Sequence, residues 1–149
     1  MKFLFLFFLS FTACIVSGCA TVKLKSEFIT PVSKVFHADY QKTWSAVMLA
    51  LEDYPIEVEN NEKGFLKSEP IQEETIWKLP FTDESKLKSA KYTLYIKLLK
   101  GKIKSRPVVK VRILKKIKVQ KGFIDEPIRV PSNGLEEKAI LYRITREII

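Results

Sequence analysis

The chain has 149 residues, with 26 Lys or Arg against 17 Asp or Glu and a formal net charge of +9 at pH 7. Hydrophobic residues make up 46% of it and charged residues 29%, a balance that is typical of a globular protein and excludes an intrinsically disordered one. One His and two Cys are too few ligands for a zinc site built on imidazole and thiolate groups.

The N-terminus has the pattern of an export signal. Lys2 precedes an apolar stretch, residues 3–16, which suits the core of a signal peptide and is too short to cross a hydrocarbon layer of about 30 Å as a helix. The next residues, VSGC at 16–19, resemble the lipobox of bacterial lipoproteins. That resemblance implies cleavage after Gly18 and attachment of a diacylglycerol group and an N-acyl chain, such as palmitate, to Cys19.

Cys14 is a poorer candidate for acylation, because the aromatic Phe11 stands where a lipobox has an aliphatic residue. If Cys14 leaves with the signal and Cys19 becomes a thioether, no thiol remains for a disulfide, a nucleophile or a metal site. The residue after Cys19 is Ala20, and not the Asp that commonly retains such proteins in the inner membrane. We therefore expect an outer-membrane protein whose domain lies on the periplasmic face, with the cell surface as the alternative.

We expect three regions in the chain: a signal peptide at residues 1–18, an acylated tether at 19–31 and a single domain at 32–149. The stretch that follows the signal, about 131 residues, is long enough for one hydrophobic core.

Two segments of this domain have helical periodicity. The first follows Asp39, a predicted N-cap, stops before Pro55 and has an apolar stripe made of Tyr40, Trp44, Val47, Met48 and Leu51. The second lies at the C-terminus, where Asn133 and Glu136 have the spacing of a capping box, and its apolar stripe is Ile140, Leu141, Ile144 and Ile148.

Between these helices, apolar and polar residues alternate with period 2, as in half-buried strands. The two longest such segments, 91–99 and 109–119, flank a predicted turn at 100–107, and Gly64 is free to take a positive φ in an earlier turn. The order strand, helix, three or four strands, helix predicts an α+β fold similar to the helix-grip fold. It has a curved antiparallel sheet, a long helix near the N-terminus and a C-terminal helix packed on one face.

The positive charge gathers in the segment that contains the two long strands. All fourteen charged residues from Lys86 to Lys121 are basic, and four of them share the predicted wet face of the second strand: Lys110, Arg112, Lys116 and Lys118. They are candidates for binding anionic lipid headgroups or an acidic partner, and the alternative is a solvated face whose lysines discourage aggregation. We expect no nucleic-acid partner, because an exported, acylated protein seldom meets one.

Several segments together resemble a known family. They are DYQKTWSAVMLALE (39–52), NEKGFLKSE (61–69), ETIWK (74–78), KSAKYTLYIKL (88–98) and EEKAILYRITREI (136–148), with Trp44, Gly64, Trp77 and Tyr92 as the most distinctive residues. The family is that of the helix-grip bacterial lipoproteins related to the C component of the outer-membrane β-barrel assembly machinery. The resemblance covers residues 32–149 and implies one such domain on an acylated tether, where that component carries two.

Catalytic patterns are weak in this sequence. His37 and Asp39 could pair as a base and its orienting group, but no Ser or Cys motif places a nucleophile beside them. A surface His and a capping Asp explain both residues. We expect a protein that is not an enzyme and that has no metal and no cofactor besides the covalent lipid on Cys19.

The expected function is that of a non-catalytic outer-membrane lipoprotein, an accessory or scaffold in envelope or β-barrel protein assembly. Its partners would be the outer membrane, through the lipid anchor, and another envelope protein. The alternative is a binding module for a lipid or an anionic ligand. Such a module would use the basic hairpin or an apolar cavity between helix and sheet, for which the candidate residues are Trp44, Met48, Trp77 and Tyr92.

Overall fold

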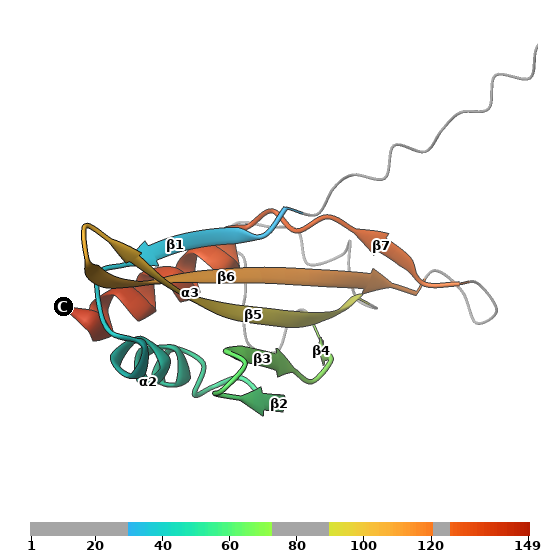
Figure 1. Ribbon diagram of the computed structural model, residues 1–149. Coiled ribbons are helices and arrows are strands. Elements are labelled where there is room, and N and C mark those ends of the chain that lie inside the picture. Colours follow the sequence, from blue (N-terminus) through green and yellow to red (C-terminus); the bar gives the residue numbers. More distant parts are fainter. Residues whose placement is uncertain (1–29, 73–89, 121–125) are drawn as a thin grey trace, which may run out of the picture.

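The computed structural model describes residues 30–72, 90–120 and 126–149. Within them, two helices and a seven-stranded antiparallel sheet confirm the α+β class (Figure 1). In chain order the elements are β1 (Val32–Phe36), α2 (Tyr40–Ala50), β2 (Ile56–Asn60), β3 (Phe65–Ser68), β4 (Ile71–Gln72), β5 (Ala90–Ile103), β6 (Arg106–Val119), β7 (Ile128–Val130) and α3 (Leu135–Ile148). The predicted signal peptide, Cys19, the tether up to residue 29, and Trp77 lie outside the described residues.

The β5–β6 hairpin is the centre of the sheet. The strand order is β1-β6-β5-β3-β2, with β4 also paired to β5 and β7 to β6. Pairing in the hairpin runs without interruption from Ala90–Val119 to Ile103–Arg106. The turn predicted at residues 100–107 is therefore wrong. The turn is Lys104–Ser105 alone, with φ angles of 47° and 63°, and such two-residue turns match the twist of the flanking strands and let pairing continue to the last residue.

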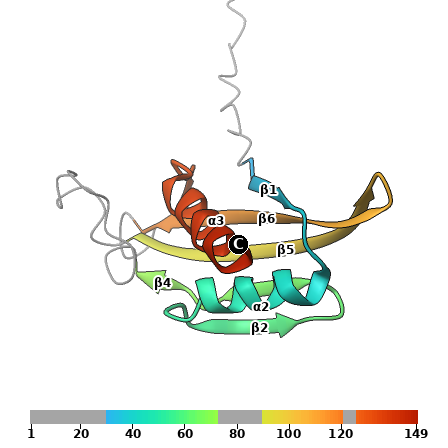
Figure 2. The same ribbon diagram turned by 90° about the vertical axis from the view of Figure 1, so that its left-hand side faces the viewer.

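Both helices cover one face of the sheet, which we call the inner face (Figure 2). α2 begins at the predicted cap, since Asp39 Oδ1 accepts a hydrogen bond of 2.8 Å from the Lys42 amide. It has 11 residues against 14 in α3, so the expectation of a long helix near the N-terminus is not confirmed. Pro55 does not extend a helix, and the chain turns at residues 51–54 to enter β2.

The hydrophobic core lies between these helices and the inner face, and the predicted stripes form it. Trp44, Val47 and Leu51 of the first helical segment are buried, and Tyr40 and Met48 pack partly buried against the core. The contributions of the C-terminal helix and the two long strands are Ile140, Leu141, Ile144, Tyr92, Leu94, Ile96, Leu98, Val109, Val111, Ile113 and Ile117.

α3 starts differently from the predicted capping box. Its N-cap is Gly134, with φ of 74°, a residue that has no side chain to cap the helix. Asn133 Oδ1 instead accepts from the Leu135 amide at 3.0 Å, and Ser132 Oγ accepts from the Gly134 amide at 3.1 Å, so the capping box is wrong. Glu136 does not reach back to the cap because its side chain is drawn into the protein interior.

The C-terminal end of α3 is held by two lysines from elements that precede it in the chain. Lys42 Nζ donates to the Ile148 carbonyl oxygen at 2.6 Å, and Lys34 Nζ donates to Thr145 Oγ1 at 2.8 Å. A cation at this end of a helix is favourable, because the last carbonyl groups lack partners within the helix.

Gly64 lies where the β2–β3 turn meets β5. Its φ is +60°, as predicted, and its carbonyl oxygen accepts from the Leu98 amide at 2.8 Å. A Cβ atom at this position would lie 2.6 Å from the Leu98 carbonyl oxygen, which is backbone and has no room to move. The turn therefore needs glycine for both its conformation and its close approach to β5.

We expect Gly64→Ala to lower the free energy of unfolding by about 2 kcal/mol or more, since it adds both a clash and a strained φ. Urea unfolding followed by circular dichroism measures the change. The matched control is Gly101→Ala in β5, where a Cβ would meet Val108 Cγ2 at an ordinary 3.4 Å and the change should stay within about 0.5 kcal/mol. Equal losses in the two variants would contradict this account.

Candidate functional site

A lysine of β6 points into the core. Lys115 lies between Ile113 and Ile117 in the residues of β6 that face the helices, and its side chain is only 4% exposed. The period of a strand places odd-numbered residues of this segment on the inner face, so the sequence carried a signal for this position. No role was predicted for Lys115, because the prediction of this face rests on its apolar residues alone.

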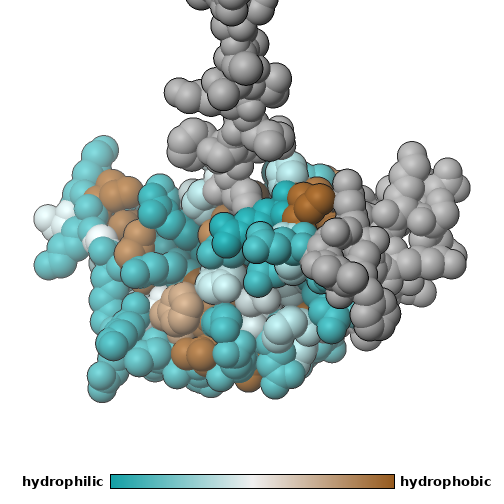
Figure 3. Space-filling model, turned by 90° about the vertical axis from the view of Figure 1, so that its right-hand side faces the viewer, coloured by the Kyte–Doolittle hydropathy of each residue, from teal (hydrophilic) through white to brown (hydrophobic). Residues whose placement is uncertain are grey.

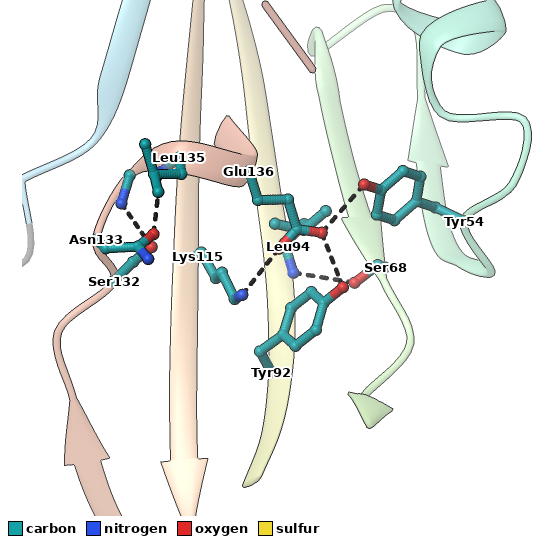
Figure 4. Close-up of polar contacts among 10 residues, drawn as sticks. Tyr54, Ser68, Tyr92, Leu94, Lys115, Ser132, Asn133, Leu135 and Glu136 are labelled. Atoms are coloured by element: carbon teal, nitrogen blue, oxygen red, sulfur yellow. Dashed lines mark hydrogen bonds and ion pairs between the residues drawn. The ribbon is translucent and has the colours of Figure 1, made fainter. Parts of the chain in front are cut away.

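The partner of Lys115 is Glu136, in the first turn of α3. Lys115 Nζ lies 2.8 Å from Glu136 Oε2. Glu136 Oε1 accepts two further hydrogen bonds, from the Tyr54 hydroxyl at 3.0 Å and the Tyr92 hydroxyl at 2.8 Å (Figure 4). Lys115 Nζ also stands 4.0 Å from the centre of the Tyr92 ring. We call these four residues the buried ion-pair cluster.

The four residues come from four parts of the fold: the loop before β2, the two long strands and α3. Each of them is at most 5% exposed. Burial raises the pKa of the Tyr54 hydroxyl above its ordinary value of 10.0, and the negative charge of Glu136 and the hydrogen bond to it raise this pKa further. Tyr54 therefore stays a protonated donor at neutral pH.

The buried ion-pair cluster has the chemistry of a structural contact between elements of the fold. Its lysine and carboxylate neutralise each other, and a buried pair of this kind is stable only with such additional hydrogen bonds. The carboxylate also lies at the positive end of the α3 dipole. The cluster thus fixes where the first turn of α3 sits on the sheet.

Glu137 is a second buried carboxylate in the same turn of α3. It is 3% exposed, and within the described part of the chain no donor reaches its Oε2 atom. By contrast, the buried Ser68 hydroxyl on β3 has partners for both of its roles. Its Oγ accepts a hydrogen bond from the Leu94 amide at 2.9 Å and donates one to the Glu69 carbonyl oxygen at 2.8 Å.

The predicted basic residues lie on the outer face, the side of the sheet that α2 and α3 leave uncovered. Lys110 is partly exposed, and Arg112, Lys116 and Lys118 are exposed; the four share the even-numbered side of β6 with the half-buried Leu114. The register sets further cations beside them, with Lys97 opposite Arg112, Lys91 opposite Lys118 and Arg129 on the other side of Lys118. Figure 3 views the molecule from this side and shows a mostly hydrophilic surface.

The described candidates for an apolar cavity are part of the packed core. Trp44 is buried in the core and stacks on Tyr40 with ring centroids 6.2 Å apart, and Met48 packs partly buried against the core. Tyr92 is buried with its hydroxyl bound to Glu136. The fourth candidate, Trp77, lies outside the described residues. His37 is exposed at the end of β1, and Asp39 serves as the helix cap.

In residues 30–72, 90–120 and 126–149, no group of three His, Cys, Asp or Glu is placed to hold a metal ion. Neither of the helices described is long and apolar enough to cross a membrane.

Comparison with known proteins gives no family assignment. No family model matches the chain, and no curated protein matches it either.

We expect Lys115→Met and Glu136→Gln each to lower the free energy of unfolding by about 3 kcal/mol, because each leaves one buried charge without its partner. The double variant removes both charges and keeps an amide oxygen for the two tyrosines. It should therefore be less destabilised than the sum of the single variants by at least about 2 kcal/mol. Urea unfolding of the four proteins completes the cycle, and Lys116→Met, one residue along on the outer face, is the control with little expected change. Additive losses would show that the pair is not coupled.

The raised pKa of Tyr54 predicts a loss of stability in alkali. The unfolded chain loses this proton near pH 10, whereas the folded protein holds it to higher pH. The stabilisation is therefore complete below pH 10 and is lost as the pH rises through 10 toward the pKa of the folded state.

Tyr54→Phe should flatten this decline and should cost about 2 kcal/mol at pH 7, since a hydrogen bond to a charged acceptor is lost. Urea unfolding between pH 8 and about pH 11 measures both effects. Tyr142→Phe is the matched control, because Tyr142 is 65% exposed on α3. The same pH profile for Tyr54→Phe and the unmodified protein would refute the assignment.

Proposed function

We propose that this chain is a lipid-anchored, non-catalytic protein of the bacterial outer membrane that acts as an accessory or scaffold in envelope or β-barrel protein assembly. The observation that carries the proposal is the division of the sheet into an inner face that α2 and α3 cover and a basic outer face that neither of these helices covers. A protein that works by contact needs such an exposed surface on a rigid support. The lipobox-like VSGC at 16–19 supports the location at the membrane.

The helix-grip fold is the finer form of this proposal. Two helices packed on one face of an antiparallel sheet, the first of them between β1 and β2, support it. The family that the sequence resembles has this fold and an acylated tether, and one of its members belongs to the β-barrel assembly machinery. We propose a partner among the proteins of the envelope, with the domain on the periplasmic face of the outer membrane or, alternatively, at the cell surface.

The second candidate is a binding module for anionic lipids or other anionic ligands, and the cations of the outer face favour it. Binding of an apolar ligand in a cavity between helix and sheet has less support. Trp44 and Tyr92 are buried in the packed core, and Glu136 already binds the Tyr92 hydroxyl.

We expect Cys19→Ala to abolish acylation and to move the protein from the membrane to the soluble fraction, because two or three acyl chains give a stable membrane anchor and their loss removes it. Labelling with radioactive palmitate and fractionation of cells on a density gradient measure both effects. Cys14→Ala is the matched control and should stay acylated in the outer membrane. Membrane retention of Cys19→Ala would refute Cys19 as the anchoring residue. Loss of acylation in Cys14→Ala would assign the acylation to Cys14 instead.

A pull-down in mild detergent with a C-terminal tag tests the scaffold role. Components of β-barrel assembly should be recovered with the acylated protein and lost with Cys19→Ala. Recovery of the protein alone from native membranes would favour the binding module.

A further inference from the structure

Toward the turn of the β5–β6 hairpin, the outer face has apolar residues beside its cations. The register there brings Leu99 beside Lys110, Lys110 beside Val35, and Ile103 beside Arg106. The next row holds Lys97 beside Arg112. We call these seven residues the hairpin face: Val35, Leu99, Ile103, Lys97, Arg106, Lys110 and Arg112.

Three large apolar side chains of the hairpin face are open to solvent. Val35 is 40% exposed, Leu99 36% and Ile103 46%. Directly paired residues have side chains about 5 Å apart, so each of the three is next to a cation. Figure 3 shows hydrophobic residues among hydrophilic ones toward this end of the sheet, at its left. The surface is therefore apolar and cationic at once.

Acidic residues are missing from these strands. β1, β5 and β6 contain no Asp or Glu, although they contain eleven Lys or Arg. At the other edge of the sheet, Glu57 of β2 binds Lys67 at 2.7 Å. Charge complementarity therefore points to an anionic partner for the hairpin face.

We propose that the hairpin face docks on a membrane surface of anionic phospholipids. Its cations would contact headgroup phosphates, while Val35, Leu99 and Ile103 enter the boundary between headgroups and acyl chains. Surfaces of this mixed kind gain both from apolar burial and from attraction to anionic lipid. An acidic protein would pair with the cations, but its acidic residues would give the three apolar side chains no apolar surface to bury against.

The arrangement of the fold fits contact with a plane. The hairpin end projects beyond α2 and α3 in Figure 2, so a flat surface can meet it without touching the helices. Its turn, Lys104–Ser105, adds a further cation at the tip.

This inference rests on the proposed anchor, and the tether is long enough for it. Thirteen residues, 19–31, can span at most about 45 Å. The domain begins at Val32, which pairs with Ile113, and the seven residues from there to Arg106 cover about 24 Å along β6. Anchor and hairpin face can therefore reach one membrane together. The anchor would also make docking intramolecular, so that a weak contact would be occupied.

The test uses the unacylated mature chain, residues 19–149 with Cys19→Ala, and vesicle flotation. Vesicles of phosphatidylcholine with 30% phosphatidylglycerol are compared with vesicles of phosphatidylcholine alone. We expect binding to the anionic vesicles only, and weaker binding at 0.5 M than at 0.05 M salt, because salt screens exposed charges. This assay needs no acylation, so its failure is distinct from a failure of the anchor.

Two pairs of variants identify the surface. Lys110→Gln with Arg112→Gln should weaken binding about twenty-fivefold, about fivefold for each cation lost at an anionic surface. Lys138→Gln with Arg146→Gln on α3 has the same net charge and should bind as the parent does. Ile103→Ser should weaken binding on the order of tenfold, whereas Leu49→Ser, which alters a 54% exposed residue of α2, should have no effect. Circular dichroism confirms that each variant is folded.

The proposal is overturned if the parent chain fails to float with anionic vesicles, which would leave an acidic protein as the partner of this face. It is also overturned if both vesicle types bind equally, or if the α3 variants lose as much binding as the hairpin variants.

Discussion

The ion pair between Lys115 and Glu136 is the contact on which the arrangement of this domain depends. Removing two charges from water is costly, and the cost is offset here by a 2.8 Å pair and by two tyrosine hydroxyls on the remaining carboxylate oxygen. Such a contact depends on the directions of the ammonium group and of both hydroxyls, so it constrains the position of α3. Apolar packing alone would allow α3 to slide or rotate, so the cluster supplies specificity that the surrounding Ile and Leu side chains do not.

The consequence is a sheet with two different faces. On the inner face, the cluster holds the first turn of α3, and Lys34 and Lys42 hold its last turn. The core is closed between these contacts. On the outer face, the same two long strands present a row of cations: Lys91, Lys97, Arg106, Lys110, Arg112, Lys116 and Lys118. Lys100 instead lies over the Tyr40 ring of α2. A single hairpin with period 2 thus provides both the support of the fold and the surface that we propose for binding.

The proposed anchor and the proposed docking surface act through different physics. Acyl chains bind through apolar burial, which is insensitive to salt and has no orientation. A cationic face is sensitive to salt and orients the domain. Together they would hold the domain near the membrane in one pose, with α2 and α3 facing away from the lipid.

The sequence by itself determined the two helices, the two long strands and their buried sides. The spacing of Trp44, Val47 and Leu51 predicted α2, the alternation in β5 and β6 predicted the long strands, and Asp39 and Gly64 were assigned their observed roles. These features depend on local periodicity and local backbone chemistry. The resemblance to a lipoprotein family and the VSGC segment remain predictions of the sequence.

Only the tertiary structure decided what Lys115 and Glu136 do. Their partnership joins residues 21 positions apart through the docking of α3 on the sheet, and no local rule separates a buried first-turn Glu from a capping one. The Lys104–Ser105 turn and the added strand β7 likewise depend on pairing with β6. Hydrophobic periodicity and secondary-structure propensity depend on residues that are close in the sequence. Burial of a charge depends on which elements pack around it in the tertiary structure.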